Sequence, residues 1–158
     1  MDIRWLVKNA VVAAAYAALT VVMAPLSYGM IQVRFAEVMT FFAAADRRYV
    51  PGLVAGCILA NIGSPLGVID LVVGTAATFC AVLCMSRCRN YFAAAIFPVV
   101  FNGVFVGAEL WQLGLLPAGV GLAAAMLYVA AGEFIAVVII GAPLMKLLME
   151  HSRLKNII

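Results

Sequence analysis

Seven polar residues that could bind a small molecule lie within long apolar stretches of this sequence. They are one guanidinium, four carboxylates and two amides: Arg34, Glu37, Asp70, Glu109, Glu133, Asn61 and Asn102. Asn102 and Glu109 are seven residues apart, so on a helix they project from one face, two turns or ~10 Å apart along the axis. Ionisable groups within lipid are costly unless they pair or face a cavity. The set is therefore a candidate binding site.

The candidate site has more acid than base. Its four carboxylates face a single guanidinium, and an ionised carboxylate only accepts hydrogen bonds. A ligand that fits is a cation or a neutral molecule rich in N–H donors, and anionic substrates are disfavoured. Tyr28 and Trp111 could stack on a planar ligand, although aromatic residues near a membrane surface are often interfacial anchors.

Each polar residue also has a purely structural interpretation. Arg34 and Glu37, three residues apart, could form a local ion pair at a helix end. Asp70 could be a favourable charge near a helix N-terminus. The asparagines could bond backbone groups or hold helices together, and Glu109 could lie in the wet interface. Glu133 has no basic residue within a helical turn, so a structural role explains it least well.

The composition places these residues in a membrane protein. The chain has 158 residues, of which 67% are hydrophobic and 11% charged, and its mean hydropathy is +1.15. Soluble domains are about half apolar and about a quarter charged, so a soluble globule, a disordered chain and a fibre are excluded. About six spans of roughly 20 residues would use nearly the whole length, which predicts one transmembrane domain over residues 1–158.

Charged residues, prolines and glycines divide the apolar sequence into six expected helices. Their approximate ranges are 7–26, 31–45, 50–62, 68–85, 91–111 and 120–148. The second covers only ~22 Å, less than the ~30 Å hydrocarbon core, so it must be short, tilted or recessed. The apolar runs lack the strict alternation of barrel strands, which predicts an all-α, polytopic membrane protein with six transmembrane helices.

The basic residues indicate an orientation. Nine of the ten lysines and arginines fall on one side of a six-span topology, and Arg34 alone falls on the other. By the positive-inside rule, both termini are expected in the cytoplasm. The basic residues occur singly or in pairs, which is not the clustering that nucleic-acid binding requires, so no nucleic-acid partner is expected.

No motif for catalysis or metal binding is present. Cys80, Cys84 and Cys88 share one expected helix face, but the only histidine, His151, lies in the C-terminal tail, so no metal is expected. The sequence has no Walker A, HExxH or GxSxG motif and no nucleophile beside a base. We therefore expect a protein that is not an enzyme.

The first expected helix carries two ladders of small residues. Ala10, Ala14 and Ala18 form one ladder, and Ala13 and Ala17 form the other. Such spacing lets two helices approach closely in a membrane. The ladders predict either tight internal packing or docking to a partner protein.

Three segments of the chain resemble the queuosine-precursor transporter family. They are APLSYGMIQVRFAE at 24–37, GLVAGCILANIGSPLGVID at 52–70 and FPVVFNGVFVGAEL at 97–110. They hold six of the seven polar residues, and the similarity covers nearly the whole chain. Members of this family are substrate-binding S components of energy-coupling factor (ECF) importers.

The resemblance implies a six-helix bundle in the bacterial plasma membrane with a ligand cavity near the outer surface. It implies capture of a deazaguanine, such as the aminomethyl form or queuine, and release inside after docking on a membrane T protein paired with two cytoplasmic ATPases. ATP would be used by those partners, and this chain would need no cofactor. In other S components an AxxxA pattern on the first helix docks; Ala10 with Ala14, Ala13 with Ala17 and Ala14 with Ala18 match it, and the register stays open.

The residues and the resemblance agree on the ligand chemistry. A guanine-like edge presents a ring N–H and an amine, which a carboxylate can accept together, and an aminomethyl ammonium would need another acid. Three alternatives stay open at this point. They are an autonomous or proton-coupled carrier in which Glu133 relays protons, an S component for another vitamin, and a structural subunit whose polar residues hold helices together.

Overall fold

The computed structural model describes residues 2–28 and 32–150, and over these ranges it contains helices and no strand. Four helical segments are long and apolar enough to cross a membrane: α1 (Ile3–Val22), α5 (Val68–Met85), α6 (Tyr91–Gln112) and the continuous segment Leu122–Leu148. The last segment consists of α7 (Leu122–Glu133), a π-helix η3 (Phe134–Gly141) and the first turns of α8 (Ala142–Glu150).

The remaining helices are shorter. They are α2 (Ala24–Ser27), the 3-10 helix η1 (Phe35–Thr40), α3 (Phe41–Ala45), the 3-10 helix η2 (Arg47–Tyr49) and α4 (Val50–Ile62). The helices expected at 50–62 and 68–85 are confirmed with their bounds. The helix expected at 7–26 starts earlier and ends at Val22, before Pro25 of α2, because proline is tolerated at a helix start and not in a helix interior.

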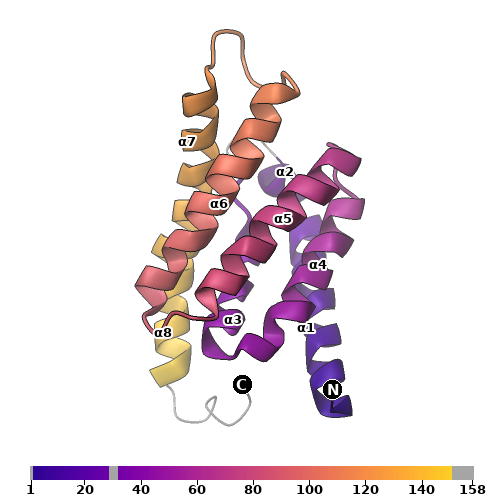
Figure 1. Ribbon diagram of the computed structural model, residues 1–158, viewed down its shortest axis with the longest axis vertical. Coiled ribbons are helices and arrows are strands. Elements are labelled where there is room, and N and C mark those ends of the chain that lie inside the picture. The colour runs from indigo at the N-terminus through magenta and orange to yellow at the C-terminus, as the bar shows by residue number, and fades with distance from the viewer. Residues whose placement is uncertain (1, 29–31, 151–158) are drawn as a thin grey trace.

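The helices form a bundle in which α1, α4, α5, α6 and α7 pack side by side in that order (Figure 1). Helix α4 contacts α1 and α5, and α6 contacts α5 and α7. The segment formed by η1 and α3 lies inside, against α1, α5, α6 and η3, and its residues Phe41 and Ala43 are fully buried. The expected short second helix is therefore recessed within the bundle, and its helical structure begins at Phe35.

Local sequence explains how the bundle turns. Asn90 accepts hydrogen bonds from the backbone N–H groups of Phe92 and Ala93 and so caps the N-terminus of α6. Gly67 has φ of +72°, a conformation that glycine adopts without steric cost, and it redirects the chain from the turn after α4 into α5.

Glycine also sets the distance between helices. A Cβ atom at Gly107 of α6 would lie 2.5 Å from the Cα of Met126 in α7, and one at Gly56 of α4 would lie 2.9 Å from the carbonyl oxygen of Ala13 in α1. Only glycine permits these approaches, which are typical of small-residue packing between membrane helices.

The outer surface of the bundle is apolar. Large hydrophobic side chains are exposed along the long helices, among them Val7, Val11, Val72, Val100 and Leu127. A water-soluble monomer rarely exposes such extended apolar surface. The interior, in contrast, contains polar and charged side chains as well as apolar ones. The described residues therefore form a helical bundle that is apolar outside and partly polar inside, as a membrane protein requires.

Candidate functional site

The seven polar residues singled out in the sequence are all buried. None is more than 3% exposed, although they come from five parts of the fold: η1 and the residue before it, α4, α5, α6 and α7. Their contacts form two groups, an ion-pair cluster around Arg34 and Asp70 and an acidic cluster of Glu37, Asn102 and Glu133.

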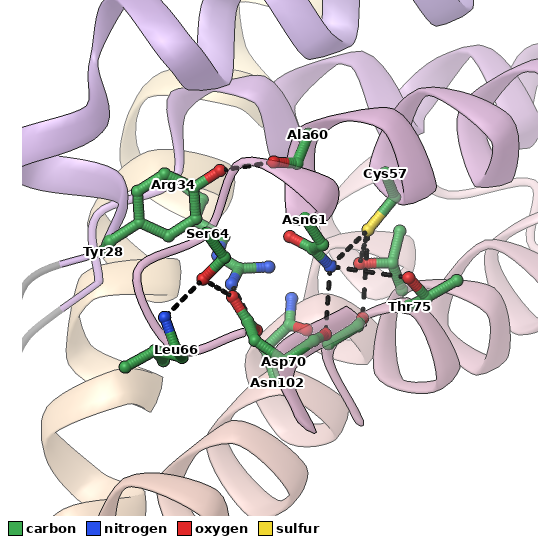
Figure 2. A network of polar contacts seen from close by, with 12 residues as sticks. Tyr28, Arg34, Cys57, Ala60, Asn61, Ser64, Leu66, Asp70, Thr75 and Asn102 are labelled. Atoms are coloured by element: carbon green, nitrogen blue, oxygen red, sulfur yellow. Dashed lines mark hydrogen bonds and ion pairs between the residues drawn. The ribbon is translucent and has the colours of Figure 1, made fainter. Parts of the chain in front are cut away.

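The ion-pair cluster consists of Arg34, Asp70 and Ser64. Nη2 of Arg34 lies 3.2 Å from Oδ1 of Asp70, and the Ser64 hydroxyl donates to Oδ2 of Asp70 at 2.5 Å (Figure 2). The backbone N–H of Leu66 donates in turn to Ser64. Arg34 is therefore paired with Asp70 across 36 residues of sequence, and the local pair with Glu37 is not formed.

Asn61 completes the surroundings of the ion pair. Its amide nitrogen donates to the backbone carbonyl of Asp70 at 3.2 Å and to Thr75 at 3.4 Å (Figure 2). A Cβ at Gly74 would lie 2.6 Å from Oδ1 of Asp70 and 2.9 Å from Nδ2 of Asn61. Because Gly74 has no side chain, the side chains of Arg34, Asn61 and Asp70 can meet beside it.

The acidic cluster lies where η1, α6 and α7 meet. The hydroxyl of Tyr16 donates to Oε1 of Glu37 at 2.5 Å, and that of Thr78 donates to the same atom at 2.9 Å. The amide nitrogen of Asn102 donates to Oε1 of Glu133 at 3.1 Å. Glu37 and Glu133 also interact electrostatically, and the amide of Asn102 interacts with both carboxylates.

Three further residues from the sequence-based set occupy different positions. Tyr28 lies against the ion-pair cluster: its ring centroid is 6.0 Å from the guanidinium carbon of Arg34, and its hydroxyl donates to the carbonyl of Ala60 at 2.8 Å. Glu109 is buried and interacts electrostatically with Arg34 and Asp70. Trp111 is 47% exposed in the last turn of α6.

Many buried polar atoms at this site have no hydrogen-bond partner among the described residues. Apart from the hydroxyl of Ser27, there are seven oxygen acceptors and only two nitrogen donors. The acceptors are Oε1 of Gln32, Oε2 of Glu37, Oδ1 of Asn61, Oδ1 of Asn102, both carboxylate oxygens of Glu109 and Oε2 of Glu133. The donors are Nε2 of Gln32 and Nε of Arg34. Buried groups are normally bonded, so this surplus of acceptors marks a place for a donor-rich ligand.

Sequence reasoning missed several members of these clusters. Tyr16, Ser64 and Thr78 were not expected at the site, yet all three contact its carboxylates directly. A signal existed for Thr78, which lies eight residues after Asp70 and therefore on the same helix face. Tyr16 lies far from the other site residues in sequence, so only tertiary packing brings it to Glu37.

The structure separates the two alanine ladders of α1. Ala13 is 6% exposed and packs against α4 at Gly56, and Ala17 packs against the core formed by α1 and α4. Ala10, Ala14 and Ala18 are exposed on the outer face of α1. The ladder of Ala10, Ala14 and Ala18 is therefore the one exposed to another protein.

Comparison with known proteins identifies the family. A family model described as QueT transporter matches residues 6–150, which is most of the chain. The chain belongs to the QueT transporter family. Searches of curated proteins and of solved structures found no match. Membership confirms the resemblance seen in the sequence, and it makes the chain a membrane transporter with a small-molecule substrate and not an enzyme.

QueT transporters act by moving a substrate, and the buried site is consistent with that task. The described residues contain no group of three or more His, Cys, Asp or Glu side chains placed to hold a metal ion. The chemistry that the site offers is recognition: several acceptor atoms inside an apolar bundle, where each hydrogen bond to a ligand is strengthened by the low dielectric.

Proposed function

We propose that this chain is the substrate-binding S component of an ATP-driven ECF importer and that it captures a queuosine precursor, a deazaguanine such as its aminomethyl form or queuine. The observation that carries the proposal is the surplus of buried, unpartnered acceptors. An aminomethyl deazaguanine has the complementary inventory: N–H donors on its ring, amine and ammonium, and only a carbonyl oxygen and one ring nitrogen as acceptors.

The proposal includes a six-span topology over one domain, residues 1–158, with both termini in the cytoplasm of a bacterial cell. The four long helices are supplemented by the segment Phe35–Ala45 and by α4. Support for the orientation comes from the described basic residues at helix ends. The start of α1, η2 and the turn between α5 and α6 lie at one end of the bundle (Figure 1) and carry Arg4, Lys8, Arg47, Arg48, Arg87 and Arg89.

Import by this mechanism requires partners, because we assign no energy source or cofactor to this chain. We propose that a membrane T protein and two cytoplasmic ATPases supply the energy and that the T protein docks on Ala10, Ala14 and Ala18. The exposure of this ladder supports that register over the one formed by Ala13 and Ala17, which pack inside the bundle.

Calorimetric titration of the detergent-solubilised protein tests the substrate. Wild-type protein is expected to bind an aminomethyl deazaguanine at micromolar concentration or below and to reject the anionic purine urate, whose negative charge repels the buried carboxylates. Binding of no deazaguanine at micromolar levels would contradict the proposal. A structural subunit would show no ligand-induced thermal shift at all.

Reconstitution into liposomes tests the coupling. Uptake is expected only when the T protein and ATPases are present together with ATP. Ala14→Leu should abolish this uptake and leave ligand binding unchanged, whereas Ala123→Leu, at an exposed alanine of α7, should affect neither. Uptake driven by a proton gradient in the absence of partners would instead favour an autonomous carrier that uses the buried pair Glu37 and Glu133.

A further inference from the structure

Three unpartnered acceptors belong to residues of the acidic cluster. They are Oε2 of Glu37, Oδ1 of Asn102 and Oε2 of Glu133, which come from η1, α6 and α7, and none of the three residues is more than 1% exposed. Their neighbouring atoms are already bonded: Tyr16 and Thr78 donate to Glu37, and Asn102 donates to Glu133. The cluster therefore holds its own side chains in place and leaves one acceptor free on each.

The orientation of the Asn102 amide is fixed by its partner. Its nitrogen lies 3.1 Å from Oε1 of Glu133, and of the two ends of an amide only the NH2 group can donate a hydrogen bond to an ionised carboxylate. The unpartnered atom of Asn102 is consequently the oxygen. When both carboxylates are ionised, all three free positions of the cluster are acceptors, and an occupant must supply donors to them.

Charge makes the requirement stronger. Glu37 and Glu133 interact electrostatically with each other and with Arg34, and the groups that donate hydrogen bonds to them, Tyr16, Thr78 and Asn102, are neutral. The guanidinium of Arg34 binds Asp70 at 3.2 Å, so its charge is already balanced by a carboxylate. Two carboxylates in a low-dielectric interior are best satisfied by a cation.

Glu109 has a different environment. It lies seven residues after Asn102 on α6, two turns or ~10 Å along the axis, and both its oxygens are unpartnered. It interacts with the neutral pair of Arg34 and Asp70 and not with a second unpaired acid. Two free oxygens on one carboxylate form a fork that suits a planar edge with two parallel N–H groups.

We propose that Glu37, Asn102 and Glu133 form a subsite for a primary ammonium group of the substrate, and that Glu109 binds the neutral N–H edge of its base. This assignment rests on the function proposed above. An ammonium group has three N–H donors on one atom, which matches three acceptors contributed by three elements. The helical rise of ~10 Å between Asn102 and Glu109 is of the order that a bicyclic base with a hydrogen bond of ~3 Å at each end would span.

Two ligands that differ only by the aminomethyl group, which carries the ammonium, test this assignment: aminomethyl deazaguanine and unsubstituted deazaguanine. Each is titrated against wild-type protein, Glu133→Gln and Glu109→Gln by calorimetry, with thermal unfolding as the check on folding. Glu133→Gln should weaken binding of the aminomethyl ligand by about tenfold or more and change that of the unsubstituted ligand by less than about twofold. Glu109→Gln should weaken both ligands by similar factors.

The possible results distinguish a failure of the subsite assignment from a failure of the proposed function. If wild-type protein binds both ligands but Glu133→Gln weakens them equally, or weakens neither, the ammonium subsite is wrong and the proposed function stands. If wild-type protein binds neither ligand, the proposed function itself fails. Glu37→Gln is the second variant should Glu133→Gln not fold, and it is expected to show the same selectivity for the aminomethyl ligand.

Discussion

The ion-pair cluster and the acidic cluster are both buried in one bundle, but they treat charge in opposite ways. In the first, the carboxylate of Asp70 has a guanidinium and a hydroxyl as partners. In the second, two carboxylates share neutral donors and keep a free acceptor on each side chain. The difference teaches that burial alone does not identify a ligand site: the two charges of the first cluster balance each other, and the second cluster has no such internal balance and requires an occupant.

The largest expected effect comes from breaking the ion pair. Arg34→Met leaves the carboxylate of Asp70 buried without its cation, so the free energy of unfolding should fall by about 3–5 kcal/mol. Denaturant unfolding in detergent measures this change. The double variant with Asp70→Asn should recover much of the loss, and a double variant as unstable as Arg34→Met alone would show that the pair does not act as a neutral unit.

A smaller effect is expected from filling the space beside the ion pair. Gly74→Ala places a Cβ 2.6 Å from Oδ1 of Asp70, which forces the pair and Asn61 apart and should lower the free energy of unfolding by about 1–3 kcal/mol. Gly121→Ala is the matched control, because a Cβ there meets nothing within 4 Å. Equal stability of the two variants in thermal unfolding would argue against a tightly packed ion-pair cluster.

The acidic cluster should respond in the opposite direction. Glu133→Gln removes one of two interacting carboxylates, so the free energy of unfolding of the ligand-free protein should rise by about 1 kcal/mol. The same substitution should weaken binding of the aminomethyl ligand, which is the usual trade-off between stability and function. Thermal unfolding without ligand measures the first effect. A loss of stability in Glu133→Gln would indicate that the cluster needs no occupant.

The smallest effect on stability is expected from the ion pair of Asp46 and Arg48 at the surface, which serves as a comparison for the buried clusters. A side-chain hydrogen bond from Arg48 lowers the pKa of Asp46 below its ordinary value. The pair therefore contributes stability above the ordinary pKa of about 4, and this contribution is lost as pH falls through the lower, folded-state value. Unfolding midpoints between about pH 5 and 3 should fall slightly more for wild-type protein than for Asp46→Asn, and high salt should remove the difference.

The main helices were predictable because long apolar runs end at prolines, glycines and charges. The ranges 50–62 and 68–85 match α4 and α5, and the range 91–111 ends one residue before α6 does. The 3-10 helix η1 and the π-helix η3 were not predictable, because their hydrogen-bonding patterns depend on packing and not on hydrophobic spacing.

The members of the site were predictable as a set, but their pairing was not. Polar residues in apolar runs pointed to the seven buried side chains. Arg34 and Glu37 have the three-residue spacing of a helical ion pair, yet Arg34 binds Asp70 instead. The alanine ladders were likewise equivalent in sequence, and only the packing of Ala13 against Gly56 distinguishes them. Which partner a residue meets is decided by the arrangement of helices, which spacing along one helix does not encode.

The recessed segment Phe35–Ala45 also bears on how the protein is made. Its helical length is less than the thickness of the hydrocarbon core. Arg34, which precedes it, pairs with Asp70, and its residue Glu37 accepts from Thr78; both partners lie in a helix that is synthesised later. Its polar groups find those partners only after α5 has been inserted. Biogenesis must therefore hold this part of the nascent chain in a provisional state, near the translocon or in water, until the downstream helices arrive.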